Sequence, residues 1–174
     1  MKVTLTHDGK SVELDLTAEQ MTALGLKEEK KRTGYERVEY GNEFWYADSA
    51  SRVLENPCGI NVFVAERYGS ANYYSDYKLA AANARADSLM RQLRRFAAEN
   101  GGIPSVDGWK KNFRIDKWEI DFDYTEDCLT PQLMRNLRSF GTIFFNTKEA
   151  CKKAIEKFKD ELIWYFTEYE AMLR

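Results

Sequence analysis

Two long amphipathic segments constrain the fold of this 174-residue chain more than any other feature of its sequence. In the first, the spacing of apolar residues alternates between three and four, which places them along one face of a helix. These residues are Leu79, Ala82, Ala86, Leu89, Leu93 and Phe96. Ser75 or Asp76 is the expected N-cap, and Gly101-Gly102 is expected to end the helix after about Asn100. A helix this long with one apolar face must pack against a sheet or another helix.

The second amphipathic segment forms the C-terminal part of the chain. Asn146 and Glu149 make a capping-box pattern at its start, and the helix is expected to run to about Leu173. Its apolar residues again alternate at spacings of four and three: Cys151, Ile155, Phe158, Leu162, Tyr165, Tyr169 and Met172. The two segments together predict a structure in which two long helices cover sheets.

Strands are predicted from aromatic and β-branched runs bounded by turn residues. Within 35–48, two strands are predicted on either side of a Gly41-Asn42 turn. Further strands are predicted at 60–65, 113–115, 118–124 and 142–145. At the N-terminus, alternation over 3–16 around Asp8-Gly9 predicts a hairpin with a type I′ turn. Thr17 and Gln20 form a capping box for a short helix that ends at Gly25. The predicted fold class is α+β: antiparallel sheets with two long helices, plus an N-terminal β-hairpin and short helix.

The distribution of charged and apolar residues divides the chain into four segments. Residues 1–26 hold the hairpin and the short helix, and 27–33 form a charged linker with no apolar side chain between 27 and 32. Two lobes, each with strands followed by a helix, are predicted at 34–102 and 103–174.

The two lobes resemble each other in sequence. Tyr73-Tyr74-Ser75 and Phe144-Phe145-Asn146 each precede a long helix, and Trp45 and Trp118 lie similar distances upstream. This pattern indicates an internal strand-strand-strand-helix repeat. Coincidence is the alternative, because an aromatic strand followed by a capped helix is a common arrangement.

Several kinds of chemistry are excluded by what the sequence lacks. His7 is the single histidine, so a Ser-His-Asp or Cys-His arrangement would have to use a residue beside a turn, where side chains are usually exposed. The chain has no Cys-x-x-Cys pair and no glycine-rich phosphate loop. We therefore predict no catalytic residue, no metal site and no cofactor.

Charge and cysteine content bear on partners and location. The net charge of −2 argues against general binding to nucleic acid or to anionic membranes. Three widely separated cysteines do not indicate a disulfide framework, and the N-terminus lacks the features of a signal peptide. A cytoplasmic location is expected, with no membrane association.

A row of carboxylates is the most specific surface feature. In 118–124, Glu119, Asp121 and Asp123 alternate with aromatic and aliphatic residues, so the two sets lie on opposite faces of a strand. The row is extended by Asp116, Glu126 and Asp127. The pattern is typical of a half-buried strand with a solvated face. It would also suit a divalent cation held with help from another strand, or imitation of nucleic-acid phosphates on a basic partner surface. We predict that the row binds a protein partner.

Basic residues gather on the first long helix. Arg91, Arg94 and Arg95 form a cluster beside the apolar stripe, with Arg85 two turns upstream. Asp87 and Glu99 lie four residues from Arg91 and Arg95, a spacing that favours surface ion pairs. The alternative function is nucleic-acid binding through these arginines, as an accessory or regulatory protein.

Three segments resemble a group of small phage, prophage and mobile-element proteins of gut Firmicutes, most of them uncharacterised. The segments are YGNEFWY at 40–46, FGTIFFNTKEA at 140–150 and DELIWYF at 160–166, and the resemblance covers most of the chain from Tyr35 onward. Proteins of that group often bind and block host machinery, and anti-CRISPR inhibitors of Cas nucleases are among them. The resemblance implies a non-enzymatic protein in the bacterial cytoplasm that inhibits a host defence complex such as a Cas effector. It transfers no residue roles.

Overall fold

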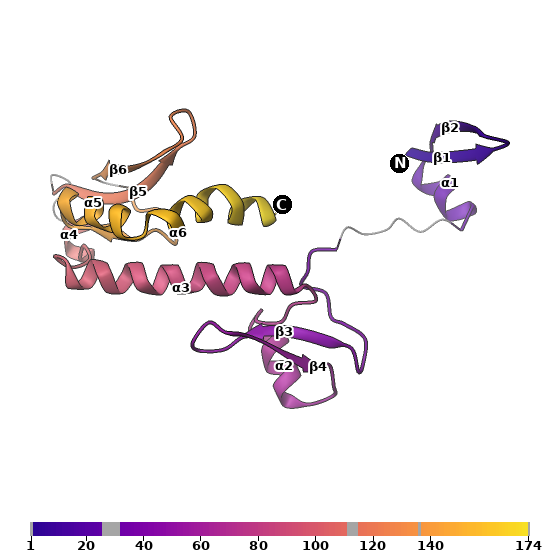
Figure 1. The fold of residues 1–174 in the computed structure, drawn as a ribbon, viewed down its shortest axis with the longest axis horizontal. Coiled ribbons are helices and arrows are strands. Elements are labelled where there is room, and N and C mark those ends of the chain that lie inside the picture. Colours follow the sequence, from indigo (N-terminus) through magenta and orange to yellow (C-terminus); the bar gives the residue numbers. More distant parts are fainter. Residues whose placement is uncertain (1, 26–31, 111–114, 136, 174) are drawn as a thin grey trace. The chain divides into compact units, whose positions relative to one another are not determined.

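The computed structural model describes residues 2–25, 32–110, 115–135 and 137–173 (Figure 1). The chain separates into two compact units, Met1–Arg32 and Thr33–Arg174. Helices and small antiparallel sheets occur in the described chain, so the predicted α+β class is confirmed. The predicted linker at 27–33 lies mostly outside the described residues, and the two predicted lobes both fall within the second unit.

The first unit is built as its sequence predicts. Strands β1 (Lys2–His7) and β2 (Lys10–Asp15) pair antiparallel, and Asp8 and Gly9 between them have φ values of 47° and 76°, as a type I′ turn requires. Helix α1 (Ala18–Ala23) follows a reciprocal capping box: the Thr17 N–H donates to Gln20 Oε1 at 2.9 Å, and the Gln20 N–H donates to Thr17 Oγ1 at 3.3 Å.

Helix α3 (Tyr77–Glu99) is the central element of the second unit (Figure 1). Asp76 is its N-cap, because the Leu79 N–H donates to Asp76 Oδ1 at 2.8 Å, and Gly101 and Gly102 beyond its end have positive φ. The predicted helix is therefore confirmed. Its first turns pack on Trp45, and its last turns pack on a sheet and helix from the C-terminal part of the chain.

The N-terminal half of this unit contains a hairpin and a short helix. Strands β3 (Glu43–Ala47) and β4 (Val53–Pro57) pair antiparallel, and helix α2 (Val62–Gly69) follows. The buried rings of Phe44 and Tyr73 stack with centroids 4.2 Å apart.

Two predictions for this half are wrong. No strand forms over 35–40, and the predicted strand at 60–65 is largely part of helix α2. The Val64 N–H donates to Asn61 Oδ1 at 2.9 Å, which caps the helix. A short apolar run suits a buried helix as well as a strand, so the cap decided the outcome.

The C-terminal half has a three-stranded sheet. Helix α4 (Val106–Lys110) precedes strands β5 (Lys117–Asp123), β6 (Cys128–Met134) and β7 (Phe144–Phe145), which are ordered β6-β5-β7 and are all antiparallel. Two of the three residues of the predicted strand at 113–115 lie outside the described residues.

The predicted C-terminal helix is interrupted. It forms α5 (Lys148–Lys157), α6 (Lys159–Trp164), a π-helix η1 (Tyr165–Tyr169) and α7 (Glu170–Met172). Phe158 separates α5 from α6, with φ −113° and ψ 21°. The apolar spacing correctly predicts the burial of Cys151, Phe158 and Leu162, but Met172 at its end is exposed, and the spacing does not reveal these changes of helix type.

The two halves share a strand arrangement that matches the sequence resemblance. Trp45 and Tyr74 exchange two backbone hydrogen bonds of 2.9 Å, and Trp118 of β5 is paired with Phe145 of β7. In each half a helix begins three residues after the paired aromatic residue, α3 at Tyr77 and α5 at Lys148. The second helix is capped by Thr147, whose Oγ1 accepts from the Ala150 N–H at 3.1 Å, and not by the predicted Asn146. Asn146 instead donates to the Gly101 carbonyl at 2.7 Å.

Candidate functional site

Strand β5 and the turn after it carry most of the predicted acidic row, and the structure divides that row into three groups. Asp116, just before the strand, forms an ion pair with Arg135, whose Nε donates to Asp116 Oδ1 at 3.1 Å. Glu119 and Asp121 line a cavity. Asp123, Glu126 and Asp127 lie at the turn between β5 and β6. The row is therefore not one continuous surface.

The alternation within β5 is only partly as predicted. Phe122 is buried, and Asp121 and Asp123 are exposed on the other face. Lys117 begins that same face, yet it is completely buried. Its Nζ donates to the carbonyls of Ile115 (2.8 Å) and Arg135 (3.3 Å). The Lys117 ammonium also lies 4.7 Å from the centre of the Trp109 ring, a cation–π contact. Sequence reasoning missed this lysine because a charged residue in an alternating strand indicates solvent exposure.

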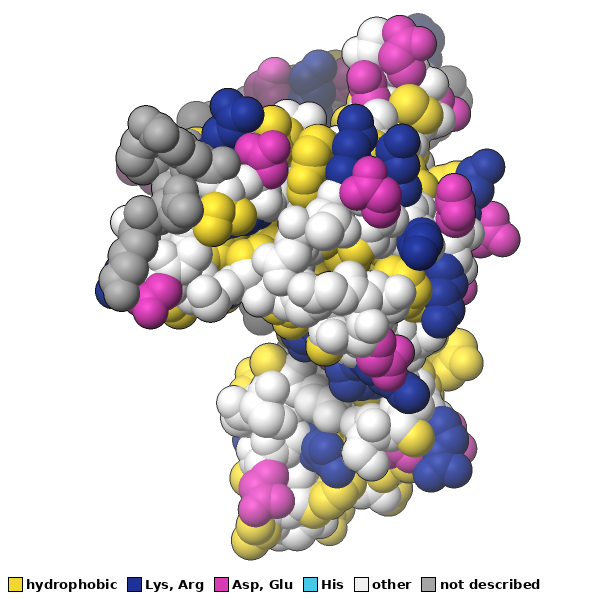
Figure 2. Space-filling model, turned by 90° about the vertical axis from the view of Figure 1, so that its left-hand side faces the viewer, with side chains coloured by type: hydrophobic (Ala, Val, Ile, Leu, Met, Phe, Trp, Pro, Cys, Tyr) yellow, Lys and Arg dark blue, Asp and Glu magenta, His cyan; other side chains and the backbone are white. Residues whose placement is uncertain are grey.

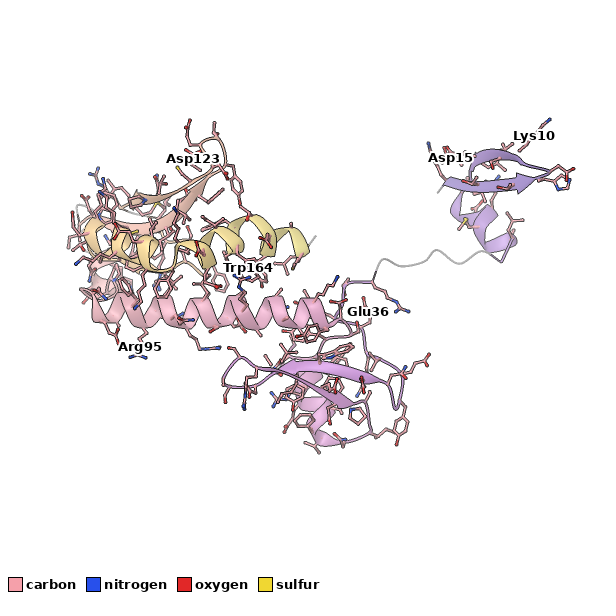
Figure 3. The ribbon with its side chains drawn as sticks, viewed as in Figure 1. Lys10, Asp15, Glu36, Arg95, Asp123 and Trp164 are labelled. Carbon is pink, nitrogen blue, oxygen red and sulfur yellow. The ribbon has the colours of Figure 1, made fainter. Side chains whose placement is uncertain are left out.

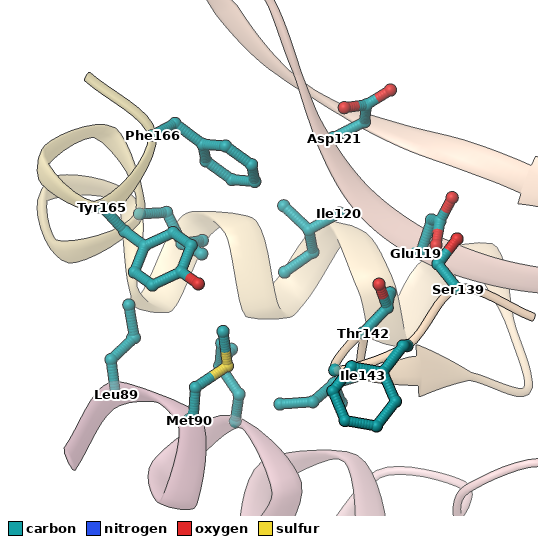
Figure 4. A pocket seen from close by; sticks show the side chains of 14 residues that line it. Leu89, Met90, Glu119, Ile120, Asp121, Ser139, Thr142, Ile143, Tyr165 and Phe166 are labelled. Atoms are coloured by element: carbon teal, nitrogen blue, oxygen red, sulfur yellow. The ribbon is translucent and has the colours of Figure 1, made fainter. Parts of the chain in front are cut away.

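The cavity has a volume of about 370 Å³ and lies between β5, α3, the segment before β7, and the junction of α6 with η1 (Figure 4). Apolar side chains make up more than half of its lining: Leu89, Met90, Leu93, Ile120, Phe140, Ile143, Leu162 and Phe166. The polar lining consists of Glu119, Asp121, Ser139, Thr142 and Tyr165. An apolar hollow with a few polar groups at one side is the usual form of a small-ligand site.

The Glu119 carboxylate is the electrostatically unusual group of the cavity. Burial raises the pKa of Glu119 above its ordinary value, and the neighbouring charge of Asp121 raises it further. The thiol of Cys151, in helix α5, donates to the backbone carbonyl of Glu119 at 3.3 Å. Burial raises the pKa of that thiol to about 12, so it stays protonated and packs as a small apolar group.

The turn between β5 and β6 presents the remaining carboxylates to solvent. Asp123 Oδ1 accepts from the backbone N–H groups of Thr125 (2.8 Å) and Glu126 (3.2 Å) and so shapes the turn. Glu126 and Asp127 are exposed, and Asp127 has φ 51°. Within the described residues, none of these three carboxylates makes an ion pair. Figure 3 shows Asp123 at the projecting end of the hairpin.

Most of the arginines predicted to bind nucleic acid have partners within the protein. Arg85 makes a bidentate ion pair with Glu161 (2.7 and 3.1 Å) and covers the Trp164 ring at 3.9 Å. Arg95 pairs with Glu99 at 2.8 Å, as its spacing predicts. Arg91 contacts the Ser51 hydroxyl instead of Asp87, and Arg94 is exposed.

These arginines do not form one basic face. At about 100° per residue, Arg85 lies roughly 120° around α3 from Arg91. Basic and acidic side chains are also interspersed on the face drawn in Figure 2. The arrangement therefore lacks the continuous basic stripe typical of nucleic-acid interfaces.

Other candidate chemistry can be placed as well. His7 is exposed, with its Nε2 3.6 Å from Asp8 Oδ2, as expected for a residue beside a turn. In the described parts of the chain, no group of three or more His, Cys, Asp or Glu side chains could hold a metal ion. None of the described helices has the length and apolar character needed to cross a membrane.

Comparison with known proteins adds no assignment to this geometry. No protein-family model matches the sequence, and no curated protein or solved structure is similar to it.

Proposed function

We propose that this chain is a non-enzymatic binding protein whose contact surface is the acidic turn formed by Asp123, Glu126 and Asp127. The observation that carries the proposal is that these exposed carboxylates project at the end of a hairpin without an ion-pair partner among the described residues. Charges left without a partner inside a protein are available to complement the opposite charge on another molecule. The partner expected from this chemistry is a protein with a basic surface.

The finer proposal names the partner as a host defence complex, with a CRISPR-Cas nuclease as the leading candidate. Such nucleases hold nucleic acid in a positively charged channel, which a protein bearing spaced carboxylates can occupy in place of phosphates. The resemblance to phage and mobile-element proteins supports this choice of partner. Exposed aromatic surface beside the acidic turn, at Tyr124, would add apolar contact area.

A cleavage assay tests the proposal directly. Cas ribonucleoproteins are incubated with increasing amounts of the chain before plasmid DNA is added, and the cleavage rate is measured. The triple variant Asp123→Asn, Glu126→Gln, Asp127→Asn retains the shape of each side chain, and asparagine tolerates the positive φ at Asp127. We expect the native chain to slow cleavage, and the variant to need at least about tenfold more protein for the same effect, which corresponds to about 1.4 kcal/mol.

A matched control separates the contact surface from net charge. The variant Glu55→Gln, Glu66→Gln, Glu156→Gln removes the same number of exposed carboxylates at other places and should inhibit like the native chain. Equal inhibition by both variants would contradict the role of the turn.

A pull-down from bacterial lysate, with and without nuclease treatment, covers other host partners. A protein retained after nuclease treatment, and lost with the turn variant, fits the proposal. Recovery that depends on nucleic acid and falls steeply with salt would favour the arginines of α3 instead.

A further inference from the structure

We propose that the cavity beside β5 binds a small amphipathic organic cation, with its apolar body on the floor of the cavity and its ammonium group at Glu119. This inference is independent of the proposed function, because it concerns a ligand of the isolated chain and uses different carboxylates from those of the β5–β6 turn. Its basis is the chemistry of the lining, the origin of the hollow and the helix geometry beside it.

The lining selects the sign of the ligand's charge. Among the described residues, Glu119 and Asp121 are the charged groups that line the cavity, and neither makes an ion pair. Asp121 Oδ1 accepts from the Phe122 N–H at 2.9 Å, whereas burial and the charge of Asp121 both raise the pKa of Glu119. A bound ammonium would relieve both effects, whereas an anionic ligand would add to them.

The apolar side of the cavity selects the body of the ligand. Leu89 and Met90 from α3 and Ile143 from the segment before β7 face the same space as Ile120 (Figure 4). The ring of Tyr165 also faces it, with its hydroxyl directed inward (Figure 4). A volume of about 370 Å³ is at the lower end of the range of ligand sites, which suits one ring with a short chain.

The π-helix is a second, independent indication. Helix α6 ends at Trp164, and Tyr165 and Phe166, the first two residues of the π-helix η1 (Tyr165–Tyr169), both line the cavity. Single π-helical turns are rare and are frequent at functional sites.

The test uses three compounds with the same apolar body. 4-Phenylbutylamine, 4-phenylbutanol and 4-phenylbutyrate are titrated into the full-length chain, and binding is followed by calorimetry and by amide chemical shifts. We expect the amine to bind at least tenfold more tightly than the alcohol and the carboxylate not to bind. Equal affinities for amine and alcohol, tighter binding of the carboxylate, or no saturable binding of the amine up to about 5 mM would overturn the proposal.

Variants locate the binding event. Glu119→Gln should lower the affinity for the amine at least tenfold while leaving the alcohol unaffected, and Asp123→Asn, at the turn, should change neither. Ser139→Trp fills the cavity from an exposed position without altering the core and should abolish binding of both compounds. Unchanged amine affinity in both Glu119→Gln and Ser139→Trp would show that the amine binds elsewhere, which also overturns the proposal.

Discussion

The two halves of residues 33–174 follow one plan, but they complete it with different side chains. Two residues beyond Trp45, the Ala47 N–H donates to Asn72 Oδ1 at 2.8 Å, and Asn72 Nδ2 donates to the Ala47 carbonyl at 2.7 Å. Strand β7 ends its pairing with β5 at Glu119 and Phe144, so the corresponding position in the second half is taken by Ile143, just before β7. An isoleucine side chain cannot bond to backbone groups, so this edge of β5 stays open and lines the cavity.

The hollows at these two positions also differ in charge. The first half has a hollow of about 550 Å³ lined by groups of both signs, among them Asp48, Asp87, Arg67 and Arg91. The cavity of the second half has an apolar floor, and the charged residues in its lining are Glu119 and Asp121, both carboxylates. One arrangement of strands and helix can therefore give either a polar hollow whose charges neutralise each other or an apolar site with uncompensated negative charge. A few side chains decide which one forms.

The largest expected effect tests the core of the first half. Phe44 and Lys117 each lie one residue before the paired tryptophan, and both are completely buried. Phe44→Ala removes a ring that stacks on Tyr73, and we expect it to lower the free energy of unfolding by about 3–5 kcal/mol. Denaturant unfolding measures the change. Tyr40→Ala, at an exposed ring, should cost less than about 0.5 kcal/mol, and a similar loss in both variants would contradict this assignment of the core.

The next effect tests the closed strand edge. Asn72→Ala leaves the Ala47 N–H and carbonyl without their partner, and we expect a loss of about 1–3 kcal/mol in the free energy of unfolding. Amide hydrogen exchange at Ala47 should accelerate in this variant toward the rate at Ile120. Asn42→Ala, in an exposed turn, is the control. An unchanged exchange rate at Ala47 would show that Asn72 does not close the edge.

A smaller effect tests the equivalence of the two helix starts. Asp76→Ala and Thr147→Ala each remove an N-cap and should each cost about 1 kcal/mol in the free energy of unfolding. Asn146→Ala removes only an exposed contact to the Gly101 carbonyl and should cost less than about 0.5 kcal/mol. A larger loss of unfolding free energy for Asn146→Ala than for Thr147→Ala would show that Asn146 is the N-cap, as predicted from the sequence.

The smallest effect is the opposite pH dependence of two glutamates, one from each half. Hydrogen bonds from the Thr33 backbone and from other groups at 33–36 lower the pKa of Glu36 to about 2. Its stabilising contribution is therefore present above pH 4.5 and is lost as the pH falls from 4.5 toward 2. Burial raises the pKa of Glu119, so its contribution is present below pH 4.5 and is lost as the pH rises from 4.5 through the raised pKa.

Carboxyl NMR titration measures both pKa values, and unfolding at several pH values measures the stabilities. Glu36→Gln should remove the loss at low pH, and Glu119→Gln should remove the loss above pH 4.5. Titration of both glutamates at the same pH would contradict the difference between the two environments.

Residues that are neighbours in the chain specify the local elements. Asp8-Gly9, the Thr17 and Gln20 capping box, and the apolar stripe with its Asp76 cap each specify a structure through neighbours in the chain, so the hairpin, α1 and α3 were predictable. The alternation in β5 and the correspondence of Trp45 with Trp118 were visible for the same reason. The alternation also predicted which positions of β5 carry carboxylates, but not which groups surround each carboxylate.

The remaining features depend on contacts between segments that are distant in the sequence. Strand β6 was not predicted, and it lies at the sheet edge, where Pro131, a residue without an N–H, is tolerated. The burial of Lys117 depends on carbonyls and a ring supplied by other segments. The cavity exists because four segments distant in sequence meet around an open strand edge. The spacing of apolar residues indicates which face of a helix or strand is apolar. Contacts between segments that are distant in the sequence determine which residues pack against that face.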